Sequence, residues 1–181
     1  MAAFATPSDL ASFLQKDVDT ATATLALNIA TGKIRDECGW SITQEVGAVV
    51  TLDGEGERAL WLPSLLVTAV ASVVENGITL TVVTQFDWTP YGKLIRVGRC
   101  WTCKPRSVVV TFTHGEATAP DTVKGISLSL AGRLYDNPGG LRSYSVGAVS
   151  ETFAGSSKDL GPGLTESEKE DLASYRLPVL A

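Results

Sequence analysis

Two cysteines at positions 100 and 103 form the pattern in this sequence that most directly suggests chemistry. The segment Cys100-Trp101-Thr102-Cys103 has the spacing of a redox-active dithiol, and the same spacing supplies half of a zinc site. A redox dithiol usually begins a helix, whereas Lys104-Pro105-Arg106 follows this pair and strands are expected on both sides. Cys38 and His114 would complete a Cys₃His ligand set, but neither belongs to a ligand pair of its own. We therefore interpret the two thiols as turn residues of a hairpin.

Other catalytic residue types are scarce. The sequence contains a single histidine, His114. Gly115 follows it at the end of an expected strand, so a turn or capping role suits this residue. The GxSxG pattern of serine hydrolases is absent. The glycine-rich segments Gly139-Gly140 and Gly161-Pro162-Gly163 lack the Lys-Ser/Thr of a phosphate-binding loop. The sequence therefore predicts that the protein is not an enzyme and holds no cofactor and no metal.

A local group of cations offers a second kind of site. Arg96, Arg99, Lys104 and Arg106 surround Trp101, and aromatic and basic side chains together can bind nucleic acid. The whole chain has 15 basic and 20 acidic residues, a formal net charge of −5, which disfavours a protein that grips a phosphate backbone. A protein interface is the favoured interpretation, with Arg96, Arg99, Trp101 and Arg106 as candidate contacts between subunits.

Helical periodicity appears at both ends of the chain. A helix is expected over 7–15, where Thr6 can cap it and Pro7 and Asp9 suit its first turn. A second is expected from 19–20 to 37 with an alanine-rich stripe, and a third begins near Asp121 with several apolar residues on one face. Thr165-Glu166-Ser167-Glu168 matches a capping box and predicts a last helix through about 175.

The middle of the chain has the pattern of short strands. Gly54-Glu55-Gly56 predicts a hairpin that joins 46–53 to 59–62, and Asn76-Gly77 predicts one that joins 66–74 to 78–83. Further strands are expected over 86–88, 93–97 and 107–113, and a loosely alternating segment over 146–153. A loop rich in Gly, Ser and Pro is expected over 154–163.

These elements predict an α+β fold: a bundle of about four helices with an antiparallel β module inserted between helices two and three. The bundle would comprise 1–43 and 116–181, with a C-terminal docking segment, and the β module would comprise 44–115. A length of 181 residues suffices for one core, or for one domain that carries an inserted module. No apolar run approaches the roughly 20 residues of a membrane span, so no membrane role is expected.

Several short segments, in this order, resemble the head-to-tail adaptor (connector) proteins of long-tailed phages of actinobacteria. The likeness covers nearly the whole chain, and its strength lies in the order of the motifs. The matching segments are Thr6-Pro7-Ser8-Asp9-Leu10, the helix end Ile34-Arg35-Asp36-Glu37-Cys38-Gly39-Trp40, Leu62-Pro63-Ser64, Trp101 ahead of 106–115, the helix 127–134, 137–147, and Gly163-Leu164-Thr165 followed by Tyr175-Arg176.

The resemblance implies a structural virion protein of the neck, at the head-tail junction, made in the host cytoplasm. Such a protein would assemble with copies of itself into a dodecameric ring beneath the portal protein and extend the DNA channel. It would present a platform to the next neck or tail protein, and DNA would pass through without specific binding. The implied portal-docking residues are Tyr175, Arg176, Leu177, Pro178, Val179 and Leu180, a segment whose apolar end is poorly explained by the surface of a monomer.

Two alternatives remain open from the sequence. A tail-completion or terminator ring protein would bind the tail tube instead of the portal. A small zinc- or thiol-dependent protein would instead use Cys100 and Cys103.

Overall fold

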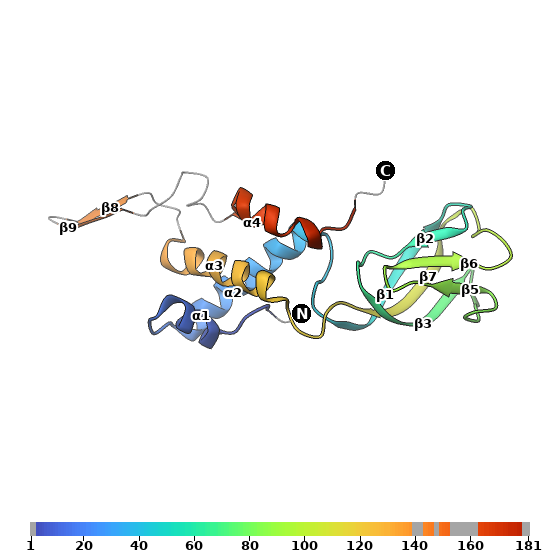
Figure 1. The fold of residues 1–181 in the computed structure, drawn as a ribbon, viewed down its shortest axis with the longest axis horizontal. Coiled ribbons are helices and arrows are strands. Elements are labelled where there is room, and N and C mark those ends of the chain that lie inside the picture. Colours follow the sequence, from blue (N-terminus) through green and yellow to red (C-terminus); the bar gives the residue numbers. More distant parts are fainter. Residues whose placement is uncertain (1–2, 139–142, 147–148, 153–162, 179–181) are drawn as a thin grey trace. The chain divides into compact units, whose positions relative to one another are not determined.

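The computed structural model describes residues 3–138, 143–146, 149–152 and 163–178 (Figure 1). The helices are α1 (Pro7–Leu14), α2 (Thr20–Cys38), α3 (Asp121–Asp136) and α4 (Glu166–Asp171), followed by the 3₁₀ helix η1 (Ala173–Tyr175). The strands are β1 (Glu45–Gly54), β2 (Ala59–Trp61), β3 (Val67–Glu75), β4 (Ile78–Thr79), β5 (Phe86–Trp88), β6 (Lys93–Arg96), β7 (Lys104–His114), β8 (Ser143–Val146) and β9 (Val149–Thr152). This mixture of helices and antiparallel strands confirms the α+β class. None of the described helices has the length and apolar character needed to cross a membrane.

The chain divides into two compact units. The helical unit comprises Met1–Cys38 and Ala119–Arg176, and the β unit comprises Gly39–Thr118 and Leu177–Ala181. Of the described residues of the C-terminal segment, Leu177 and Pro178 belong to the β unit in this division.

Local capping explains where α1 begins. The Thr6 hydroxyl accepts a hydrogen bond from the Asp9 amide at 3.2 Å, and an Asp9 carboxylate oxygen accepts one from the Thr6 amide at 2.8 Å. This reciprocal pair satisfies two amides that the first helical turn leaves without partners. Asp9 also pairs with Lys124 of α3 at 2.9 Å, so the same carboxylate joins two helices. The helix predicted over 7–15 is confirmed.

The helical unit buries its apolar residues where α1, α2 and α3 meet. Small side chains dominate the α2 side of this core, and small side chains let helix axes approach closely. The core residues are Ala5, Leu10, Ala23, Ala26, Leu27, Ala30, Leu128, Leu130 and Ala131. The alanine-rich stripe expected on the second helix is thus the face that packs.

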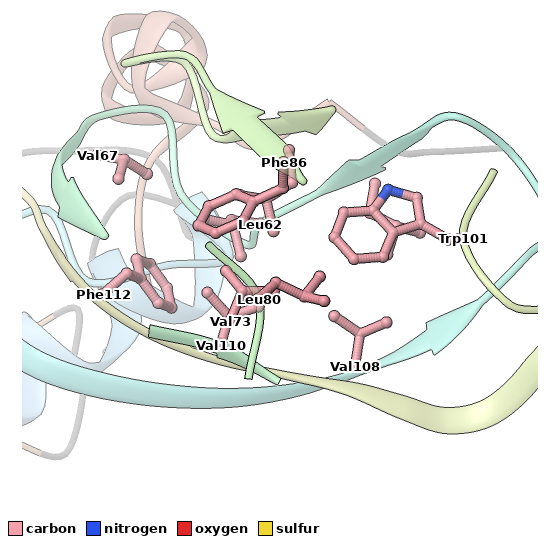
Figure 2. Packing of buried hydrophobic residues seen from close by; sticks show 11 residues of the cluster. Leu62, Val67, Val73, Leu80, Phe86, Trp101, Val108, Val110 and Phe112 are labelled. Atoms are coloured by element: carbon pink, nitrogen blue, oxygen red, sulfur yellow. The ribbon is translucent and has the colours of Figure 1, made fainter. Parts of the chain in front are cut away.

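The β unit packs a four-stranded sheet, in the order β1-β7-β3-β4, on a three-stranded sheet, in the order β2-β6-β5. Both sheets contribute to one apolar core: Val73, Val108 and Val110 come from the larger sheet, and Phe86 comes from the smaller one (Figure 2). Each fully buried side chain of this kind stabilises the fold by about 1.5–3 kcal/mol. The core also includes Trp101, which lies outside the strands.

Of the two predicted hairpins, one is confirmed and one is wrong. Asn76 and Gly77 have positive φ angles of 50° and 80° and join β3 to β4, as the sequence predicts. The strands on either side of Gly54-Glu55-Gly56 do not pair with each other: β1 pairs with β7, and β2 pairs with β6 in the other sheet. After β1 the chain crosses to the smaller sheet, where the Arg58 carbonyl accepts a hydrogen bond from the Arg96 amide at 2.8 Å.

The last helix begins at the predicted capping box. The Thr165 hydroxyl accepts from the Glu168 amide at 3.2 Å, and Glu168 accepts from the Thr165 amide at 2.9 Å. Both Glu168 oxygens also accept hydrogen bonds from Arg133 of α3 at 2.8 Å, so a bidentate ion pair fastens α4 to α3. The segment expected over 146–153 contains β9, which pairs with the preceding β8. The loop expected over 154–163 lies almost entirely outside the described residues.

Candidate functional site

The cation group predicted from the sequence centres on a buried carboxylate. Glu75, at the end of β3, lies 3.1 Å from the Nη2 atom of Arg96 on β6, and each of these side chains is only 2% exposed. Arg96 also donates to the carbonyl of Gln85 and lies over the ring of Trp101, 5.6 Å from its centroid. A charge buried to this degree is tolerated because its partners replace the water it has lost.

The same carboxylate holds the loop 97–103. The amide and the hydroxyl of Thr102 each donate to Glu75 Oε1 at 2.9 Å, and Arg99 donates to Oε2 at 3.0 Å. Burial raises the pKa of Glu75, but the hydrogen bonds from Thr102 and Arg96 outweigh burial, so this pKa lies below its ordinary value. Glu75 is therefore a charged anchor that fixes the path of the chain between β6 and β7.

The four candidate interface residues differ in accessibility. Arg96 and Trp101 are buried inside the β unit, so neither side chain is available at the surface of the subunit. Arg99 keeps 64% of its side chain exposed although it reaches Glu75. Arg106 is exposed, and its amide donates to Asp53 at 2.7 Å. An interface role consequently rests on Arg99 and Arg106, while Arg96 and Trp101 support the loop from inside.

The three cysteines are free thiols that differ in burial. Cys100 and Cys103 are free and exposed, and Cys38 is free and buried. Burial raises the pKa of the Cys38 thiol to about 11. Among the residues that the structure describes, no group of three or more His, Cys, Asp or Glu side chains could hold a metal ion. His114 is buried against Phe112, with ring centroids 4.9 Å apart, and burial lowers the pKa of its imidazole while the nearby Glu45 raises it in part.

The C-terminal segment leaves η1 in an extended conformation. Arg176 pairs with Glu37 of α2, and its φ and ψ of −79° and 138° are close to those of polyproline II. Leu177 lies against Gly39, where an added Cβ atom would be 3.6 Å from Leu177 Cδ1. Tyr175 is half-buried and Pro178 is exposed, while Val179 and Leu180 lie outside the described residues.

An apolar groove of about 470 Å³ opens on the β unit, and the sequence pattern gave no direct sign of it. Its walls come from β1, from β2 and the segment after it, from the turn before β6, and from the C-terminal segment. The lining residues are Val50, Leu52, Trp61, Leu62, Pro63, Ser64, Leu65, Tyr91, Leu177 and Pro178. Two members of the candidate docking segment, Leu177 and Pro178, therefore form part of the groove wall.

Backbone hydrogen bonds explain why an exposed tyrosine stands at this groove. The Leu62 amide donates to the Gly92 carbonyl at 2.8 Å, and the Val67 amide donates to the Pro90 carbonyl at 2.7 Å. Gly92 has a φ of +78°, and a Cβ atom there would lie 2.5 Å from the Ser64 carbonyl oxygen, so the turn closes tightly only with glycine. Tyr91 is thereby held at the groove while it remains 75% exposed, and Trp61 is 43% exposed.

The fold is similar to that of two solved structures. No protein-family model and no curated protein matches the sequence. A chain described as "Neck of native GTA particle computed with C12 symmetry" aligns with a TM-score of 0.61 and 18% identity, covering 98% of this chain and 94% of that chain. A chain described as "Neck of empty GTA particle computed with C6 symmetry" aligns with a TM-score of 0.61 and 19% identity, covering 100% of this chain and 96% of that chain.

Proposed function

We propose that this protein is a head-to-tail adaptor, a structural subunit of the neck of a phage-like particle. The observation that carries the proposal is the similarity of the whole fold, over 98% of this chain, to a chain of a neck computed with C12 symmetry. The order of the sequence motifs supports the same assignment. The role of such a subunit is architectural and requires no catalytic residues.

In this proposal the subunits form a twelve-membered ring, matching the C12 symmetry of the similar neck. A ring closes through a heterologous interface, in which one face of a subunit meets a different face of its neighbour. Arg99 and Arg106 are the exposed cations that would serve such a contact on the β unit. β1 is an edge strand of ten residues, and its free edge offers backbone groups to a neighbouring chain.

The ring would dock on the portal protein through 175–180 and extend the channel for DNA. The next neck or tail protein would bind the opposite end of the ring. A formal net charge of −5 suits a channel through which DNA passes, because a strongly basic wall would retain the phosphate backbone.

Deletion and complementation test this function in the particle that encodes the chain. Without the protein, we expect DNA-filled heads that lack tails, and expression of the intact chain should restore tailed particles. A Leu180→Asp variant should assemble poorly and should lose co-sedimentation with the portal protein, whereas Ile78→Asp, an exposed change in the β unit, should not. Tailed, infectious particles formed without the protein would overturn the proposal.

A further inference from the structure

We propose that, in the unassembled subunit, the apolar groove of the β unit is the binding site for residues 179–181 of the same chain, which follow the groove-lining Leu177 and Pro178. These residues overlap the portal-docking candidate 175–180, so they would have two alternative binding sites. Only the second site, on the portal, rests on the proposed function; binding in the groove does not.

The chemistry of the groove suits an apolar extended peptide. Trp61, Pro63 and Tyr91 line it, and aromatic side chains that flank a shallow groove bind proline-containing segments in polyproline II conformation. Ser64 is the polar member of the lining, and its hydroxyl is already bonded to the Leu66 carbonyl at 3.1 Å. The groove therefore offers apolar contact area, and its lining provides few hydrogen-bonding groups for a charged or strongly polar ligand.

The path of the chain leads into this groove. Arg176 has polyproline II angles, and the next two residues, Leu177 and Pro178, form part of the groove wall. Three residues follow, Val179-Leu180-Ala181, and all three are apolar. At about 3.3 Å per residue, three residues can span roughly 10 Å when extended.

Tethering makes even weak binding effective. A segment attached to the surface that it binds has an effective concentration on the order of millimolar. Burial of the side chains of Val179 and Leu180 would also cover apolar surface on Trp61 and Tyr91 that the free subunit otherwise exposes to water. In the assembled neck, docking of the segment on the portal would leave the groove open.

The indole N–H signal of Trp61 reports on the groove in nuclear magnetic resonance spectra of the full chain. The chain has 4 tryptophans, and a Trp61→Phe variant identifies this signal by its loss. In a Leu180→Asp variant and in a chain that ends at Arg176, we expect the Trp61 signal to move while the signals of Trp88 and Trp101 stay in place. Because the shortened chain also lacks the groove-lining Leu177 and Pro178, the Leu180→Asp variant is the decisive one, and a Trp61 signal that stays in place in that variant would overturn the proposal.

A peptide of sequence 176–181 provides the second arm. Added to the shortened chain, it should return the Trp61 signal to its wild-type position, and it should bind the intact chain roughly tenfold or more weakly because the tethered segment competes. Tyr91→Ser should weaken peptide binding, whereas Ile78→Ser, an equally exposed apolar position outside the groove lining, should not. Equal binding to the intact and shortened chains would overturn the proposal, and so would a Trp61 shift that depends on protein concentration, which would indicate a second copy in the groove.

The portal protein separates this inference from the proposed function. Portal added to the intact chain should move the Trp61 signal to the position seen in the shortened chain. If the peptide binds the groove but the intact chain does not bind portal, the groove assignment stands and the adaptor function fails.

Discussion

Glu75 and Arg96 form an ion pair inside the β unit, with 3.1 Å between Glu75 Oε2 and Arg96 Nη2. Glu75 ends β3 in the larger sheet, and Arg96 ends β6 in the smaller one, so the pair joins the two layers at one end of the core. Through Thr102 and Arg99 the same carboxylate also fixes the loop that leads into β7. This relationship sets the path of the chain toward the exposed Arg106.

Replacing the carboxylate should destabilise the β unit. Glu75→Gln keeps the shape of the side chain but leaves Arg96 as a buried charge without its counterion. Breaking a buried ion pair by removing one partner costs about 3–5 kcal/mol in the free energy of unfolding. Urea denaturation followed by tryptophan fluorescence measures the loss. Glu55→Gln, an exposed change, is the control and should stay within about 0.5 kcal/mol; an equal effect of the two variants would contradict the role of the pair.

The single histidine should make stability depend on pH in a window where few other groups titrate. Burial holds the pKa of His114 below its ordinary value of 6.5. The unfolded chain therefore binds a proton as the pH falls below about 6.5, while the folded chain does not, so the free energy of unfolding should decrease. His114→Phe should remove this dependence between about pH 6.5 and 5. The one imidazole signal in the proton spectrum gives the folded-state pKa directly, and a value at or above 6.5 would refute the prediction.

The thiols should fall into two classes of reactivity. Cys100 and Cys103 are exposed, whereas Cys38 is buried and burial raises its pKa to about 11. Because the thiolate is the reactive form, a chromogenic disulfide reagent should modify two thiols rapidly and the third only on unfolding. Cys100→Ser with Cys103→Ser should leave ring assembly and particle yield unchanged. Stoichiometric zinc in protein purified without chelator would instead favour the metal-dependent alternative.

Arg106 should affect assembly without affecting the fold of the subunit. Its side chain is exposed. The hydrogen bond to Asp53 comes from the backbone amide of Arg106, which every substitution except proline keeps. Arg106→Glu should change the free energy of unfolding by no more than about 0.5 kcal/mol while it reduces ring formation on the portal, as seen by mass photometry. Arg106→Lys, which keeps the charge, should assemble like the unchanged chain. Normal rings from Arg106→Glu would remove this residue from the interface.

Local signals in the sequence predicted local structure well. The caps at Thr6 and Thr165 and the turn at Asn76-Gly77 depend on residues within three or four positions, and all three are confirmed. The hairpin predicted at Gly54-Glu55-Gly56 is wrong because β1 pairs with β7, whose partner residues lie 50 to 69 positions further along the chain. A glycine-rich turn signals a change of direction but does not choose the strand that pairs.

The candidate site was predicted less completely, for two physical reasons. From the sequence, a charged residue in a strand is expected to be solvent-exposed. Arg96 is buried because it pairs with Glu75, and the sequence does not indicate that pairing. The groove is formed by segments distant in sequence, with Tyr91 held against Leu62 by backbone bonds of the turn, and side-chain patterning carries no information on such contacts. The role of the C-terminal segment stays a prediction; within the described residues, Leu177 and Pro178 of this segment line the groove.

Electron cryo-microscopy of the neck of the particle that encodes this chain tests the adaptor assignment most directly. The account predicts a ring of twelve copies between portal and tail, with 175–180 of each copy on the portal and the groove beside Trp61 and Tyr91 free of that segment. A neck built without this chain, or this chain found elsewhere in the particle or absent from it, would contradict the account.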